Sequence, residues 1–234
     1  MKLLTTTLAG LLVSAFLTPV AMSQAPDRRS RFQHGGVPEF DRPPLAKDNQ
    51  EKQALAVLDE MSKGKWYLNV TTREGRVLRQ LTEAVGAKRV VEIGTSSGYS
   101  TIWLALAVQS TGGKVFTHEI NPEMVKIASA NFKKAGVESL VTIIEGDAHE
   151  TVKQHKEPID ILFLDADKKG YIDYLEKLLP LVRPGGLILG SDMHPPMSPK
   201  PDPRYIEAIT KNPDLDTSFI MMESFGISMT LKKR

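Results

Sequence analysis

The spacing of apolar positions changes repeatedly from residue 48 onward, and these changes predict the secondary structure. In some segments, such as 49–63, apolar residues recur every three or four positions, which is typical of a helix with one buried face. In others, such as 159–165, short and nearly continuous apolar runs predict buried strands. We expect helices over 49–63, 71–87, 99–110, 121–136, 170–182 and 203–212, strands over 89–94, 114–120, 141–147, 159–165 and 185–192, and a C-terminal hairpin from 215–222 and 226–233.

The order of these elements predicts an α/β fold. Near-continuous apolar strands that alternate with helices indicate a parallel sheet covered by helices on both faces. The C-terminal hairpin would add two antiparallel strands at one edge. We therefore expect a doubly wound, mostly parallel, seven-stranded sheet of the Rossmann-like type. In such a sheet the ligand lies beyond the carboxyl ends of the strands.

The first 47 residues follow a different pattern. Lys2 precedes an apolar stretch over 3–20, and small residues follow at positions 21, 23 and 25. This predicts a cleaved secretory signal peptide over 1–23, with an uncleaved membrane anchor as the alternative because the stretch is nearly long enough to span a bilayer. If the leader is cleaved, we expect export to the periplasm or cell envelope. If it is not, we expect a cytoplasmic protein. Residues 24–47, rich in Pro, Gly and charge, predict a flexible spacer, and 48–234 a single domain.

Composition narrows the classes of partner. The chain has 234 residues, 41% hydrophobic and 25% charged, with a formal net charge of +2 at pH 7 and no cysteine. This balance is typical of a soluble protein with a core, and it gives no case for nucleic acid or an acidic membrane surface as a partner. The lack of cysteine excludes a disulfide, a thiolate nucleophile and a Cys-ligated zinc site.

The ends of the five predicted parallel strands read IGTSSG, HEI, EGD, LDADK and GSD, and four of the five carry a carboxylate. The carboxyl ends of parallel strands meet at one edge of the sheet, where ligands of such folds bind. A protein without a ligand would have little reason to repeat an acid at these positions. The pattern therefore indicates a binding site along this edge.

The turn after the first strand offers a place for such a ligand. Gly94 and Gly98 let backbone N–H groups approach a bound molecule, although a turn that only serves packing is the alternative. The third glycine of the dinucleotide fingerprint is missing, which disfavours a pyrophosphate. Glu119, about 25 residues further on, suits a ribose hydroxyl, and Asp147 suits an adenine amino group or a neighbouring amide. An adenosine ligand without pyrophosphate points to S-adenosylmethionine, with solvated strand-end acids as the alternative.

Several segments together resemble the cation-dependent O-methyltransferases, the relatives of catechol and caffeoyl-CoA O-methyltransferases. The resemblance runs from about Trp66 to the C-terminus, through VVEIGTSSGYSTIWLALA, THEINPEMVKIASANFKKAG, IIEGDAHE, LFLDADKKGYIDYLEKLLPLVRPGGLI and GISMTLKK. It implies methyl transfer from S-adenosylmethionine to a hydroxyl of a small, catechol-like molecule, with Trp66 and Leu68 at the substrate mouth and Asn69 near the cofactor. It implies cofactor contacts at Val70, Glu92, Gly94, Gly98, Tyr99, Ser100, Glu119, Ile120, Asp147, Ala148 and Asp165.

The same resemblance gives the charged stretch LDADKK a role. It implies that Asp165 and Asp192 hold a divalent cation and that Lys168 is the general base. Carboxylate oxygens suit Mg²⁺, and a hydroxyl bound to the cation is acidified, so that a nearby lysine can take its proton. The structural alternative for Lys168 is a salt bridge to Asp165 or Asp167.

The chain departs from the family pattern at one position of the cation site. The family has asparagine after the second metal aspartate, whereas here Met193 follows Asp192, and a thioether is a poor ligand for Mg²⁺ or Ca²⁺. Either the two carboxylates hold the cation with more water, or His194 takes the third position and favours a softer metal, or the metal is lost.

Two further functions remain open from the sequence. An exported, non-catalytic ligand-binding module on the same fold is favoured by the predicted leader, because S-adenosylmethionine is made in the cytosol, and by Met193. A nucleotide-dependent oxidoreductase is disfavoured by the missing third glycine. The sequence does not identify the substrate. It does not determine the oligomeric state either, and a homodimer is one possibility.

Overall fold

The structure, a computed structural model, describes residues 43–65, 67–194, 200–220 and 225–234 of the chain. The predicted signal peptide, the larger part of the predicted spacer and Trp66 lie outside these residues. No helix within the described part of the chain is long and apolar enough to cross a membrane.

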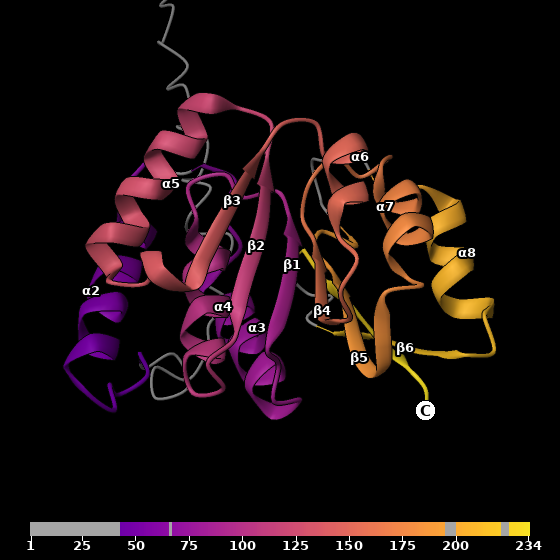
Figure 1. The fold of residues 1–234 in the computed structure, drawn as a ribbon, viewed down its shortest axis with the longest axis horizontal. Helices are drawn as coiled ribbons and strands as arrows, with labels where there is room; N and C mark the ends of the chain where they lie inside the picture. The colour runs from indigo at the N-terminus through magenta and orange to yellow at the C-terminus, as the bar shows by residue number, and fades with distance from the viewer. Residues whose placement is uncertain (1–42, 66, 195–199, 221–224) are drawn as a thin grey trace, which may run out of the picture. The chain divides into compact units, whose positions relative to one another are not determined.

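A seven-stranded sheet runs through the described residues in the order β3-β2-β1-β4-β5-β7-β6 (Figure 1). The pairs from β3 to β5 are parallel, and the pairs that join β5, β7 and β6 are antiparallel. The predicted doubly wound, mostly parallel sheet with an antiparallel C-terminal hairpin is therefore confirmed. The strands are β1 (Arg89–Ile93), β2 (Lys114–Glu119), β3 (Val141–Glu145), β4 (Ile159–Leu164), β5 (Val182–Gly190), β6 (Leu215–Ile220) and β7 (Ile227–Lys232).

Two hydrophobic cores lie on the two faces of the sheet, because successive strand residues point to opposite sides. Val90 and Ile161 pack with α2, α3, α4 and α5, whereas Val91 and Leu162 pack with α7 and α8. The helices are α2 (Asn49–Lys63), α3 (Thr72–Ala84), α4 (Tyr99–Gln109), α5 (Pro122–Ala135), α6 (Ala148–Thr151), α7 (Tyr171–Leu178) and α8 (Pro203–Lys211).

Local sequence explains where these helices begin and end. Asn121 caps α5, Pro122 takes its first position, and Gly136 ends it with a φ of 71°. Helix α7 stops at Leu178, earlier than predicted, because Pro180 has no N–H to continue it. The short helix α6 was not predicted, since four residues are too few to establish a helical period.

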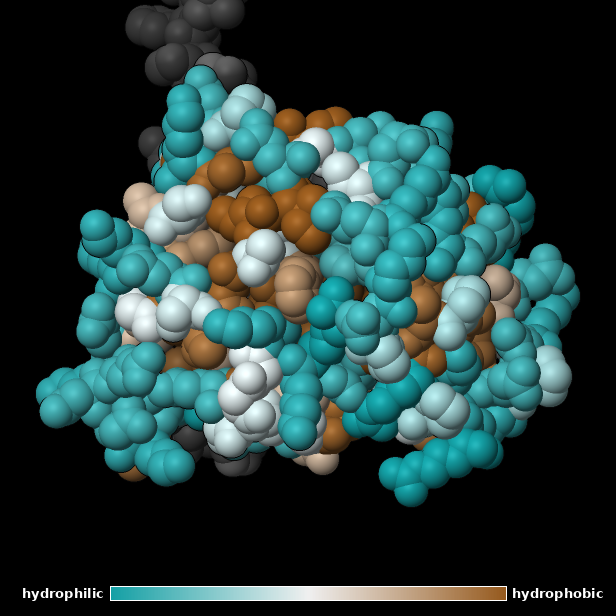
Figure 2. All heavy atoms as spheres, viewed as in Figure 1, coloured by the Kyte–Doolittle hydropathy of each residue, from teal (hydrophilic) through white to brown (hydrophobic). Residues whose placement is uncertain are grey.

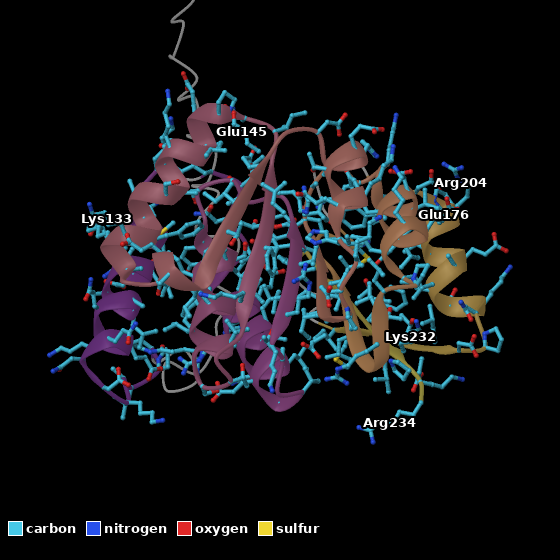
Figure 3. All side chains as sticks on the ribbon, in the orientation of Figure 1. Lys133, Glu145, Glu176, Arg204, Lys232 and Arg234 are labelled. Atoms are coloured by element: carbon cyan, nitrogen blue, oxygen red, sulfur yellow. The ribbon has the colours of Figure 1, made fainter. Side chains whose placement is uncertain are left out.

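The surface is polar over most of the face in Figure 2, with apolar side chains visible over β2 and β3. In β3, which lies at the edge of the sheet, the residues are half-buried or exposed. Charged side chains such as Lys133, Arg204 and Arg234 extend from the outside of the molecule (Figure 3). Most of the charged groups discussed next differ from them because they are buried or half-buried at the carboxyl ends of the strands.

Candidate active site

The turn between β1 and α4 runs so close to its neighbours that only glycine fits at two positions. Gly94 has a φ of 102°, and a Cβ there would lie 2.4 Å from the backbone oxygen of Asp165. Gly98 has a φ of 86°, and a Cβ there would lie 2.4 Å from the Phe132 ring. Gly98 also has no side chain to cap α4, so the first N–H groups of this helix can face a ligand. The turn thus has the geometry that the sequence predicted for cofactor binding.

Glu119, at the end of β2, holds this turn in place. Its buried carboxylate accepts hydrogen bonds from the backbone N–H groups of Ser96 (2.7 Å) and Asn121 (2.9 Å). Each carboxylate oxygen has a further lone pair, so Glu119 can still accept bonds from two ligand hydroxyls. Ile120, the next residue, is 67% exposed and offers an apolar surface beside it.

Asp147 and Ala148 lie at the neighbouring strand end. The N–H of Gly146 donates to the backbone oxygen of Glu119 (2.8 Å), which brings the residues after β3 beside the end of β2. The exposed carboxylate of Asp147 caps α6 by accepting from the N–H of His149 (2.9 Å), and Ala148 is half-buried. The predicted ribose and adenine positions therefore belong to one continuous edge.

Glu92 lies beneath the turn and is fully buried. The hydroxyls of Ser100 and Thr101 donate to its two carboxylate oxygens, each at 2.5 Å. Burial raises the pKa of the Glu92 carboxyl to about 7, although these hydrogen bonds act in the opposite direction. The described contacts link Glu92 to the turn through Ser100, one of the predicted cofactor residues.

The segment before α3 is attached to the same turn. The Ser96 hydroxyl donates to the backbone oxygen of Tyr67 (2.7 Å), and the Ser97 hydroxyl donates to Oδ1 of Asn69 (2.7 Å). Val70 is buried in the core, whereas Leu68 is exposed and has a φ of 61°.

Tyr99, the first residue of α4, fastens the start of α3 to this region. Its ring is buried, and its hydroxyl lies 3.0 Å from Oγ1 of Thr72. The segment before α3, the start of α3 and the region of the predicted cofactor turn are therefore connected by hydrogen bonds.

Lys168 lies between two carboxylates at the ends of β4 and β5. Its Nζ is 3.1 Å from Oδ1 of Asp165 and 3.1 Å from Oδ2 of Asp192, and it donates to the hydroxyl of Tyr171 (2.7 Å). The Tyr171 hydroxyl in turn donates toward the backbone oxygens of Leu164, which ends β4, and Ser191, which follows β5. The structure thus brings together the predicted base and both predicted metal ligands. Asp167, the other partner considered for Lys168, accepts a bond from Tyr174 instead.

Burial and charge act against each other in this cluster. Burial raises the pKa of the Asp165 carboxyl to about 7, even though the Lys168 ammonium beside it acts to lower that pKa. Burial also acts to lower the pKa of Lys168, but the charges of Asp165 and Asp192 more than offset it and raise the pKa above its usual value. In the absence of a ligand, Lys168 therefore carries a proton that the two carboxylates hold in place.

The backbone around Asp192 directs Met193, which occupies the third family position, into the core. Asp192 adopts a φ of 55°, which turns the chain so that the N–H of Met193 donates to Gly226. The Met193 side chain is buried in the core that contains Tyr205, while His194 is exposed. Among the described residues, no three or more His, Asp or Glu side chains lie close enough to form a metal site. The two carboxylates of Asp165 and Asp192 are the oxygen donors that contact Lys168.

One buried acid near the cluster was missed by the sequence analysis. Glu74 forms a capping box with Thr71 at the start of α3, and its charge acts on Asp165, Lys168 and Asp192. The spacing T-x-x-E at 71–74 predicts the capping box. It does not predict that α3 begins beside the ends of β4 and β5.

Comparison with known proteins gives the family. A family model described as O-methyltransferase matches residues 46–193. A catechol O-methyltransferase of Niastella koreensis is 37% identical over 130 residues, which cover 54% of this chain and 58% of the relative. A caffeoyl-CoA O-methyltransferase of Medicago sativa is 34% identical over 165 residues, which cover 64% of this chain and 66% of the relative. The chain spans little more than half the length of the first of these relatives.

Solved structures share the fold over most of their length. An O-methyltransferase from Bacillus cereus in complex with SAH has a TM-score of 0.66 and 29% identity, covering 81% of this chain and 93% of that chain. The O-methyltransferase TomG from Streptomyces achromogenes, in complex with SAM, has a TM-score of 0.67 and 25% identity, covering 84% and 95%. These matches disfavour the oxidoreductase alternative. The family model matches more than half of the residues of this chain, and the chain therefore belongs to the O-methyltransferase family.

Proposed function

We propose that this protein transfers a methyl group from S-adenosylmethionine to a hydroxyl of a small, catechol-like aromatic molecule, with the help of a divalent cation. The observation that carries the proposal is the position of Lys168 between Asp165 and Asp192, beside the turn at Gly94. A base, two oxygen ligands and a cofactor turn at one edge are the groups that this reaction needs. The names of the catechol and caffeoyl-CoA relatives support the class of substrate.

The edge of the sheet formed by the strand ends is suited to bind the cofactor. Glu119 would accept hydrogen bonds from the two ribose hydroxyls, and Ile120 would supply an apolar surface for the adenine ring beside Asp147 and Ala148. The methionine part would lie along the turn at Gly94, Gly98 and Ser100. The acidic groups at this edge also favour a ligand whose sulfonium is positively charged.

Asp165 and Asp192 fit a hard divalent cation. Mg²⁺ binds through one or two carboxylates and keeps several waters, so two converging carboxylates meet its needs without a third protein ligand. This agrees with the burial of Met193 in the core. A bound cation would supply positive charge that acidifies the substrate hydroxyl and offsets the carboxylate charges that hold the proton on Lys168.

The chain's own residues then account for the transfer. Neutral Lys168 takes the proton of the substrate hydroxyl, and the oxygen attacks the methyl carbon in line with the C–S bond. That bond breaks with its electron pair on sulfur, which leaves S-adenosylhomocysteine, while the proton stays on Lys168. The protein positions the two reactants and removes the proton. The Tyr171 hydroxyl keeps Nζ of Lys168 in place by accepting a hydrogen bond from it.

The test is methyl transfer to a panel of catechols, first in EDTA and then with Mg²⁺, Mn²⁺ or Ca²⁺ restored. We expect activity to be lost in EDTA and restored by Mg²⁺, and Asp192→Asn to require more added metal. Full activity in EDTA would remove the cation from the proposal. Restoration by a softer ion but not by Mg²⁺ would instead favour His194 as a ligand. Tight cofactor binding without transfer to any hydroxyl would favour the ligand-binding alternative.

A further inference from the structure

Glu74 is a buried carboxylate with one oxygen left over. The residue is 1% exposed, and its Oε2 accepts a hydrogen bond from the N–H of Thr71 at 2.7 Å. Its Oε1 has no hydrogen-bond partner among the described residues. A buried polar atom without a partner costs roughly 1–3 kcal/mol, so its presence needs an explanation.

The start of helix α3 does not supply that explanation. A capping box needs one side-chain oxygen at this position, and glutamine provides it as well as glutamate. The Thr71 hydroxyl completes the box by accepting from the N–H of Glu74 at 3.2 Å. Capping therefore accounts for Oε2, but neither for the second oxygen nor for a charge in a buried place.

The charged groups near Glu74 indicate what its second oxygen could serve. Its charge acts on Asp165, Lys168 and Asp192, the groups at the ends of β4 and β5. One buried carboxylate, Glu74, and two half-buried ones, Asp165 and Asp192, thus share one ammonium. Such an excess of negative charge away from water is unfavourable unless a positively charged ligand joins the cluster.

We propose that Glu74 is a third carboxylate of the cation site, and that its Oε1 accepts a hydrogen bond from a water bound to the cation that Asp165 and Asp192 hold. This inference rests on the cation in the proposed function. The bond is to a water because the described residues include no group of three acidic or histidine ligands that could hold a metal directly. Glu74 would then orient the water bound to the cation. It would take over the role of the third family ligand, which Met193 cannot perform.

The experiment is a titration of the full-length protein with Mn²⁺, in which free Mn²⁺ is measured by electron paramagnetic resonance. The variant is Glu74→Gln, which removes the charge but keeps the capping oxygen. The matched control is Glu83→Gln, at the other end of the same helix, where the carboxylate is half exposed. Groups that orient the ligands of a metal site typically contribute 10–100-fold to its affinity, so we expect Glu74→Gln to raise the Kd for Mn²⁺ by about that factor. Glu83→Gln should bind like wild type.

Calorimetry with S-adenosylhomocysteine and thermal unfolding separate the other outcomes. We expect Glu74→Gln to bind this ligand within about twofold of wild type and to unfold at a similar temperature, because the capping box is kept. An unchanged Kd for Mn²⁺ in Glu74→Gln would overturn the inference. So would a loss confined to S-adenosylhomocysteine binding, which would place Glu74 at the cofactor. If wild type binds no Mn²⁺ yet transfers methyl groups, the inference and the cation fail while the transferase stands.

Discussion

The buried acid Glu92 gives a direct test of the electrostatics beneath the cofactor turn. Replacement by glutamine keeps its shape and removes its charge. Burial raises the pKa of the Glu92 carboxyl from 4.5 to about 7 in the folded protein. At about 1.4 kcal/mol per pKa unit, this difference is worth about 3 kcal/mol.

The direction of the effect follows from the sign of the pKa change. Below pH 4.5 the carboxyl is protonated in both the folded and the unfolded chain, and burial costs little. As the pH rises from 4.5 to 7, the Glu92 carboxyl loses its proton in the unfolded chain but keeps it in the folded protein. The free energy of unfolding therefore decreases over this range. The free energy of unfolding of wild type, relative to that of Glu92→Gln, should therefore fall by about 3 kcal/mol between pH 4 and pH 8.

The assay is urea unfolding at several pH values, followed by circular dichroism. Glu145→Gln is the control, since this acid at the end of β3 lies on the surface (Figure 3) and should leave the pH profile of wild type unchanged. Ser100→Ala removes a donor that lowers the pKa of Glu92, so it should move the transition to higher pH. Parallel pH profiles for wild type and Glu92→Gln would refute the account of this acid.

Three other perturbations test separate parts of the structure. Glu119→Ala should weaken the binding of S-adenosylmethionine in calorimetry by roughly 10–100-fold, the worth of about 1.5–3 kcal/mol for hydrogen bonds to a charged group, and unchanged affinity would remove Glu119 from the site. Gly94→Ala should lower the free energy of unfolding by more than Gly112→Ala, which has a φ of 67° but open space around it, and equal losses would contradict the close packing of the turn. Burial lowers the pKa of His118 to about 3 and that of His155 to about 4, so the unfolded chain takes up protons first as the pH falls below 6.5. The free energy of unfolding should therefore be highest above pH 6.5 and fall toward pH 4. In urea unfolding, the double variant His118→Gln/His155→Gln should lose less stability over this range, and an equal loss would contradict the account.

The fold was predictable from the sequence because its strands and helices have distinct periods. The run IDILFL is β4 from end to end, and Pro122 and Gly136 frame α5 where the capping rules place them. Helix α6 was missed because it has a single turn, and the strand β5 begins earlier than predicted, at Val182, with an irregular register near its start. Local signals therefore determined most of the architecture.

The site was predictable only as far as the strand ends that carry it. The carboxyl ends of β4 and β5 meet by the rules of parallel sheets, and this brings Asp165 and Asp192 to Lys168. The position of Glu74 depends instead on how α3 packs against distant parts of the chain, and the burial of Met193 depends on the backbone turn at Asp192. No spacing in a single sequence encodes those contacts.

The most direct test of the proposed methyl transfer is a single turnover with ¹³C-methyl S-adenosylmethionine and a catechol, with Mg²⁺ present. Wild type should yield the O-methylated product and S-adenosylhomocysteine in a one-to-one ratio by mass spectrometry. Lys168→Met should bind the cofactor nearly as well, because Lys168 contacts carboxylates and Tyr171, but form product roughly 10²–10⁴-fold more slowly, the usual contribution of a general base. Equal rates for the two proteins, or cofactor bound by wild type without any labelled methyl on a hydroxyl, would contradict the account.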